Sequence, residues 1–240
     1  MPKFISLSKD DLTCAISTRS AFNMSLTYGK KQGVIENRRR FLEEIGIDYR
    51  DLVCAQQVHG SNVSCVKEQD KGKGALALES AIPYTDALIS DKRNVPLAVF
   101  TADCLPIFLY EPKRGMIGLV HAGWRSSKER IASKAVGLMR QKFGIDKESI
   151  RAFLGPAIRS CCYEVGREFF DFFPGQVIKK DGRFYLDLVR ANIEELEGAG
   201  VPQDNILDTG VCTCCGNDNF FSFRKEGPSC GRMMAVIMLK

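Results

Sequence analysis

The sequence predicts a mixed α/β fold of the α+β kind. Apolar stretches typical of strands and amphipathic stretches typical of helices occur along the whole chain. Several strand-like stretches are direct neighbours, above all residues 97–110 and 116–121, which are rich in Val, Ile, Leu and Phe as buried strands are. Strand pairs without an intervening helix do not fit a doubly wound nucleotide-binding fold.

The first elements follow from periodicity and from the residues that end them. Residues 34–45 predict a helix, because Gly46 stands at the position where helices commonly end. Residues 52–58 predict a strand that ends at His59-Gly60, and residues 87–90 a short strand. The polar stretch 67–74 predicts a surface loop.

The second half continues the mixture. Residues 128–143 predict a helix, with a capping-box spacing from Ser126 to Glu129 and a stop at Gly144. Residues 150–154 predict a strand, 163–173 and 188–197 predict helices, and 220–223 with 233–239 predict a hairpin around 225–231. Because no linker or repeat interrupts the chain, we expect one domain over residues 1–240.

Composition narrows the class of protein. The 34 Lys and Arg against 29 Asp and Glu are interspersed and give a net charge of +5, which favours a small anionic ligand over nucleic acid. The run Arg38–Arg40 is typical of a solvated helix face. No apolar run reaches 18 residues and the N-terminus has no signal-peptide pattern, so we expect a cytoplasmic protein without membrane contact.

Ten cysteines are many for such a chain, and we do not expect disulfides without a secretion signal. A structural zinc site needs two Cys-x₂₋₄-Cys pairs. Only Cys212 and Cys215 have that spacing, with Cys230 distant from them. We therefore expect these cysteines and the Cys161-Cys162 pair to be free or buried thiols. A second metal ion at the cysteines around Cys212 and Cys215 is the alternative, and a redox role is left open.

Three short segments carry metal-capable side chains near the ends of apolar stretches: QVHG with His59, ADCLP with Cys104 and HAGWR with His121. A four-residue turn at 111–114 would place Cys104 directly opposite His121 in a hairpin. With His59 they would form a three-ligand set with an open fourth position, as in catalytic zinc sites. Such a site lowers the pKa of bound water toward about 7. Two core histidines beside a buried cysteine remain the alternative.

The strings QQVHG, TDALIS, LAVFTADCLPIFLY, IGLVHAGWR, GPAIRSCCYEVG, LDLVRANIEEL and FFSFRKEG…GRMMAVIML resemble the laccase-domain family, also called YfiH-like or polyphenol oxidase proteins. The match runs from about residue 19 to the C-terminus. The resemblance implies one zinc ion bound by His59, Cys104 and His121, rather than copper. It also implies two packed mixed β-sheets flanked by helices, in α/β/β/α layers.

The activity implied by the resemblance is that of a purine nucleoside phosphorylase, acting on adenosine, inosine and methylthioadenosine with phosphate, with some adenosine deamination. Deamination needs an activated water, which a zinc site can supply. The sequence departs from the family near Thr18-Arg19, where the usual Gly-rich GGVS-type loop is shortened. The preferred nucleoside and the oligomeric state do not follow from the sequence.

Phosphorolysis needs cations for phosphate and a proton donor for the leaving purine. Arg125 is the first choice for phosphate, because it lies at a strand-to-helix turn beside a helix N-terminus. Asp103 is expected either to orient a metal-bound histidine or to act as general acid or base. Further candidates for binding the base, the ribose or an anion are Asn37, Arg38, Gln57 and Arg224, and Trp124 is a candidate for stacking on the purine.

Three other functions compete with this hypothesis. A multicopper oxidase is not expected, because its oxygen-reducing cluster needs more histidines than the two in this chain. A metal-free cysteine hydrolase would use Cys104 as nucleophile and His121 as base. A non-enzymatic adaptor or a peptidoglycan quality-control factor would use zinc for folding and would tolerate Arg125→Ala.

Overall fold

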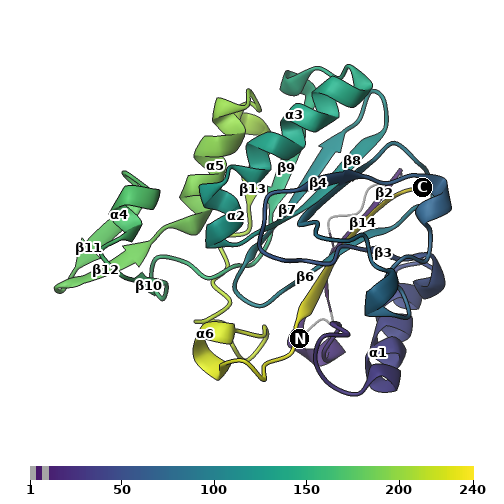
Figure 1. Ribbon diagram of the computed structural model, residues 1–240, viewed down its shortest axis with the longest axis horizontal. Helices are drawn as coiled ribbons and strands as arrows, with labels where there is room; N and C mark the ends of the chain where they lie inside the picture. Colours follow the sequence, from purple (N-terminus) through teal and green to yellow (C-terminus); the bar gives the residue numbers. More distant parts are fainter. Residues whose placement is uncertain (1–3, 7–10) are drawn as a thin grey trace.

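The computed structural model describes residues 4–6 and 11–240, and Figure 1 shows its arrangement. The prediction that the N-terminus carries no signal peptide concerns residues that lie in part outside the described ones. Two large sheets form the body. The first has the order β1-β2-β14-β6-β3 and the second β13-β9-β7-β8-β5-β4. A small sheet of order β10-β12-β11 lies beside them.

The first sheet contains β1 (Phe4–Ser6), β2 (Leu12–Ser17), β14 (Met233–Leu239), β6 (Leu97–Thr101) and β3 (Val53–Cys54). The second sheet contains β13 (Ile206–Asp208), β9 (Arg151–Leu154), β7 (Leu105–Glu111), β8 (Met116–Ala122), β5 (Ala87–Ser90) and β4 (Val63–Cys65). The small sheet contains β10 (Glu164–Val165), β12 (Arg183–Leu186) and β11 (Val177–Lys180). The helices α1 to α6 are Lys31–Glu44, Trp124–Lys128, Ile131–Phe143, Phe169–Phe172, Leu188–Gly198 and Phe223–Glu226.

Three hydrophobic clusters define the layers. The middle cluster lies between the two large sheets, and a second lies between the first sheet and α1. The third lies between the second sheet and helices α3 and α5. Strand β14 shows how one sheet contributes to two clusters. Because alternate side chains of a strand point to opposite faces, Ala235 and Ile237 lie in the middle cluster, whereas Met234 and Val236 lie in the cluster beside α1. The layers confirm the expected α/β/β/α arrangement.

Most of the predicted elements exist with shifted bounds. The strand over 87–90 is β5, and the predicted helices 34–45 and 188–197 are α1 and α5. The apolar stretch 97–110 is two strands, β6 and β7, which lie in different sheets. The predicted strand 52–58 shrinks to β3, since only Ala55 beyond it forms a further bridge. Gly144 ends α3 in the left-handed conformation, as expected.

Two predictions about local structure were wrong, and one helix starts later than expected. The helix predicted over 128–143 is α3, which begins at Ile131 because Arg130 adopts a positive φ of 62° and separates it from the short helix α2. Residues 163–173 begin as strand β10, which pairs with β12. The C-terminal hairpin does not form, because β14 pairs with β2 and β6 instead. In both wrong predictions the pairing of strands outweighs the local pattern.

Arg38 also departs from the expected solvated face. It is 1% exposed, and its guanidinium donates to the carbonyls of Met24, Gly74 and Ala75. A buried arginine costs free energy unless acceptors surround it. Arg38 therefore joins α1 by hydrogen bonds to the loops that contain Met24 and Gly74-Ala75. Arg39 and Arg40 remain solvated and form ion pairs with Glu36.

None of the helices in residues 11–240 combines the length and the apolar character needed to cross a membrane. Antiparallel pairing of β7 with β8 places the start of β7 beside the end of β8. Only three residues lie between the end of β6 and the start of β7. Cys104 is the last residue of this connection, and His121 lies near the end of β8 at the same end of the sheets.

Candidate active site

His59, Cys104 and His121 meet at this end of the sheets. Their nitrogen and sulfur atoms all lie within 4.8 Å of one another, and the two imidazole rings meet edge to face with centroids 4.8 Å apart. His121 is buried, Cys104 half-buried and His59 exposed. The spacing fits the ligands of one metal ion with a position open toward solvent.

The hairpin register differs from the expected one. Glu111 pairs with Met116 and Pro106 with His121, so the turn lies one residue further along the chain. Cys104 therefore lies diagonal to His121 and beside Gly123, not directly opposite His121. Because side chains alternate with a period of two, this shift leaves Cys104 and His121 on the same side of the sheet.

Gly123 leaves room for the three side chains. A Cβ at this position would lie 3.1 Å from both Cys104 Sγ and His59 Cδ2. Any larger residue would therefore push into the cluster. Gly123 also precedes α2, where its N–H donates to Ser126 Oγ. The helix thus begins at Trp124, earlier than expected, and it has only five residues.

Asp86 positions both histidines, and the sequence analysis missed it. His121 Nδ1 lies 2.8 Å from Asp86 Oδ1, and the backbone N–H groups of Val58, His59 and Gly60 donate to the same carboxylate. Burial raises the pKa of Asp86, but the hydrogen bonds from His121 and the backbone outweigh burial and hold it below its usual range. With Nδ1 engaged, His121 Nε2 is the nitrogen left to bind a metal.

The Cys104 thiol and the His121 imidazole favour their charged forms together. Burial raises the pKa of Cys104, but attraction to His121 and hydrogen bonds from both histidines lower it to about 6. Burial likewise lowers the pKa of His121, and Cys104 with Asp86 raises it to about 9. Cys104 is therefore disposed to be a thiolate, the form that binds metals or attacks electrophiles.

Asp103 does not contact either histidine, so the expectation that it orients one was wrong. It adopts a positive φ of 88°, and its carboxylate accepts from Thr213 Oγ1, Ser222 Oγ and the Arg224 backbone N–H. These three donors come from the C-terminal part of the chain. Asp103 thus anchors that segment beside Cys104.

A cavity of ≈ 520 Å³ opens beside the three side chains. This volume suits a small ligand. Its walls combine the cluster with arginines, aromatic rings and short polar residues: Ser25, Thr27, Tyr28, Gln57, Phe100, Asp103, Trp124, Arg125, Tyr163, Leu188, Phe223, Arg224 and Arg232. The segment 25–28 follows Thr18-Arg19, so the shortened loop region borders the cavity.

Cations and aromatic rings alternate around the cavity. Arg125 lies over Trp124, Arg224 over Tyr163 and Arg232 over Tyr28, at 4.4, 5.3 and 4.4 Å from the ring centroids. Within the described part of the chain, neither the Arg125 nor the Arg224 guanidinium has a hydrogen-bond acceptor, which leaves both available for an anion. Arg232, by contrast, donates to the Cys230 and Gly231 carbonyls.

Two of the residues selected from the sequence lie elsewhere. Both lie on α1: the Arg38 side chain is on the buried face of this helix, and the Asn37 side chain donates to the Asn23 carbonyl. Neither lines the cavity. Gln57 lines it, but its amide donates to the Phe100 carbonyl and accepts from the Phe100 N–H, like a strand neighbour. Tyr163 and Arg232 were missed, although both lie in the strings that carried the resemblance.

The sequence profile of the family described as "Multi-copper polyphenol oxidoreductase laccase" matches residues 13–240. The chain belongs to this laccase family. The "Purine nucleoside phosphorylase YlmD" of Geobacillus stearothermophilus is 36% identical over 228 residues, which cover 91% of this chain and 83% of that protein. "Adenosine deaminase RL5" from an unknown prokaryotic organism is 33% identical over 217 residues, 86% and 82% of the two chains.

Solved structures of the laccase family agree with the fold. The crystal structure of YlmD from Geobacillus stearothermophilus superposes with a TM-score of 0.95 at 32% identity, covering 100% of this chain and 97% of that one. The hypothetical protein YfiH of Bacillus licheniformis gives 0.96 at 31% identity, with the same coverage. The relatives' names support a nucleoside-processing enzyme of the laccase family with a small-molecule substrate.

Proposed function

We propose that this protein is a zinc-dependent purine nucleoside phosphorylase that acts on adenosine, inosine and methylthioadenosine. The observation that carries the proposal is the three-ligand cluster in a cavity that also presents two guanidinium groups, those of Arg125 and Arg224, for which residues 4–6 and 11–240 provide no acceptor. The names of the relatives support the same reaction. The shape and charge of the cavity support a nucleoside and a phosphate as the small molecules bound.

His59, Cys104 and His121 would hold the metal ion. One thiolate and two imidazoles suit zinc, and Asp86 supplies the carboxylate that keeps His121 in the ligating tautomer. A zinc ion held there would supply positive charge that can polarise a bound substrate. Copper oxidation of the multicopper type needs further histidines, and the whole chain has two.

In phosphorolysis a phosphate oxygen attacks C1′ of the ribose while the purine leaves with the electrons of the glycosidic bond. Arg125 and Arg224 would bind the phosphate through charge-assisted hydrogen bonds. Asp103 would position Arg224, because its carboxylate holds the backbone N–H of that residue. Trp124, Tyr163 and Tyr28 would contribute aromatic rings against which a purine could pack beside the arginines that lie over them.

Two further activities have support of their own. The name of the relative RL5 supports adenosine deamination as a side activity, which phosphate-free assays would detect as inosine. The lowered pKa of Cys104 beside His121 supports a metal-free cysteine hydrolase. A thiol enzyme would survive chelation and be inactivated by iodoacetamide, whereas a zinc enzyme would lose activity on chelation.

The deciding experiment measures zinc and copper by plasma mass spectrometry, and adenine release from adenosine with and without phosphate, on the wild type and Cys104→Ala. We expect Cys104→Ala to lose one zinc ion and phosphate-dependent activity by about 10³-fold or more, since removing one transition-state donor alone costs about 10²–10³. Cys65→Ser, half-buried on β4, is the matched control. Full activity without zinc would contradict the proposal.

A further inference from the structure

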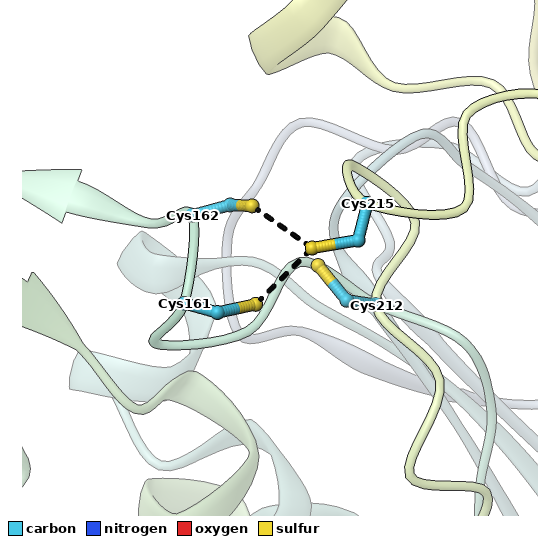
Figure 2. Close-up of side chains that lie close together, drawn as sticks. All are labelled: Cys161, Cys162, Cys212 and Cys215. Carbon is cyan, nitrogen blue, oxygen red and sulfur yellow. Dashed lines mark hydrogen bonds between the residues drawn. The ribbon is translucent and has the colours of Figure 1, made fainter.

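Four cysteines outside the active site meet at the surface. The sulfur atoms of Cys161, Cys162, Cys212 and Cys215 all lie within 4.8 Å of one another. Cys215 Sγ is 3.5 Å from Cys161 Sγ and 3.3 Å from Cys162 Sγ. Figure 2 shows the four side chains pointing from two loops toward a common point. We call them the four-cysteine cluster.

The distances between the sulfurs fit metal coordination. A tetrahedral zinc ion with Zn–S bonds of about 2.3 Å places its sulfurs about 3.8 Å apart. The distances from Cys215 Sγ to the sulfurs of Cys161 and Cys162 are close to that spacing, and four thiolates complete a tetrahedral shell. A single disulfide would join only two of the four sulfurs, whereas one tetrahedral ion uses all four.

The loops that carry the sulfurs are held in place by contacts of their own. The Cys162 N–H donates to the Arg159 carbonyl, and the Gly216 N–H donates to the Cys212 carbonyl, so each pair sits on a tight turn. A Cβ on Gly216 would lie 3.0 Å from the Cys212 carbonyl oxygen, which explains the glycine after Cys215. Preorganised ligands lower the free-energy cost of binding an ion.

Backbone and side-chain contacts also connect the loop of Cys161 and Cys162 to the segment that carries Cys212 and Cys215. The Thr213 N–H donates to the Ala157 carbonyl. Arg159 makes a two-point hydrogen-bonded ion pair with Asp208, with N–O distances of 2.6 and 2.5 Å. The first ligand pair therefore cannot move independently of the second.

We propose that Cys161, Cys162, Cys212 and Cys215 bind a structural zinc ion, separate from the ion at His59, Cys104 and His121. Four thiolates saturate tetrahedral zinc and leave no position for a substrate, which distinguishes a structural from a catalytic site. The sequence analysis expected free or buried thiols, because it looked for two Cys-x₂₋₄-Cys pairs. The fold supplies the second pair as the adjacent residues Cys161 and Cys162.

The proposed ion would stabilise one wall of the active-site cavity. Tyr163, which lines the cavity, directly follows Cys162. Thr213, which donates to Asp103, lies between the ligands Cys212 and Cys215. One loop leads directly to Tyr163 in the cavity wall, and the other reaches the wall through the hydrogen bond from Thr213 to Asp103, so the ion would support the wall without contacting substrate.

The test is metal content after zinc loading and gel filtration in reducing buffer. We expect about two zinc ions per chain in the wild type, and about one in either Cys104→Ala or the double variant Cys212→Ser/Cys215→Ser. Cys214→Ser, in the same loop but outside the cluster, is the matched control and should keep both ions. Because the two sites share no ligand, failure at one site is distinguishable from failure at the other.

Thiol mapping on the wild type needs no variant and so does not depend on folding of a mutant. We expect N-ethylmaleimide to spare the four cysteines of the cluster until a chelator is added, as read by peptide mass spectrometry. Labelling of all four in zinc-loaded protein would overturn the proposal. So would a wild type that binds only the ion lost in Cys104→Ala, a Cys162–Cys215 disulfide in place of bound metal, or iron at the cluster in place of zinc.

Discussion

The active-site trio and the four-cysteine cluster both gather metal-capable side chains from segments distant in sequence, but they differ in ligand number and in surroundings. His59, Cys104 and His121 offer three ligands beside a cavity of ≈ 520 Å³. The cluster offers four sulfurs from two hydrogen-bonded turns. Three ligands leave a position for chemistry, whereas four complete the shell.

The two regions also differ in what holds their ligands. A single buried carboxylate, Asp86, contacts His121 and the backbone of the His59 loop. The cluster depends on backbone turns and on the Arg159–Asp208 ion pair. A side-chain contact can be removed by one substitution without disturbing the fold, so the comparison can be tested residue by residue.

The largest effect on metal binding from a single contact is expected at Asp86. Asp86→Asn keeps the size of the side chain but removes the negative charge beside His121. Loss of an outer-shell carboxylate typically costs about 10–100-fold in metal affinity or activity. We expect this loss for the active-site zinc alone, measured by chelator competition, with the cluster zinc retained. Asp91→Asn, just beyond β5, is the control; an unchanged affinity in Asp86→Asn would contradict the role given to Asp86.

Arg125 is expected to matter for phosphate and not for metal. A hydrogen bond to a charged group contributes about 1.5–3 kcal/mol, so Arg125→Ala should lower kcat/KM for phosphate by about 10–100-fold. Zinc content at both sites should stay unchanged. Lys128→Ala on the same helix, whose ammonium lies over Phe172, is the matched control. A normal kcat/KM for phosphate in Arg125→Ala would remove this residue from the proposed phosphate site.

The smallest effect is expected at Thr213, which links the two regions. Thr213→Val leaves one oxygen of buried Asp103 without its donor, which costs about 1–3 kcal/mol of the free energy of unfolding. Zinc content should not change, and activity should fall only a few-fold. Thr209→Val is the matched control, because the buried Thr209 hydroxyl has no partner within the described residues. Denaturant unfolding of both variants measures the free energy of unfolding. Equal values for Thr213→Val and Thr209→Val would contradict the role given to the Thr213–Asp103 hydrogen bond.

Local patterns predicted the elements whose own residues suffice to form them. The α5 helix has one apolar face and β5 is a short apolar run, and both formed close to their expected bounds. The patterns failed at 163–173 and 220–239, where strands pair with partners far along the chain. The shift of the β7–β8 turn shows the same limit: the face of Cys104 was predictable, but its exact neighbour was not.

The sequence by itself determined the apolar layers, the placement of Cys104 and His121 at strand ends, and the family. Periodicity and short motifs are local properties, so they can be seen without a structure. Only the tertiary structure decided that Asp86 holds both histidines, that Arg38 is buried, and that two cysteine pairs 50 residues apart converge. These contacts depend on which strands become neighbours, and that is decided by the packing of the whole chain.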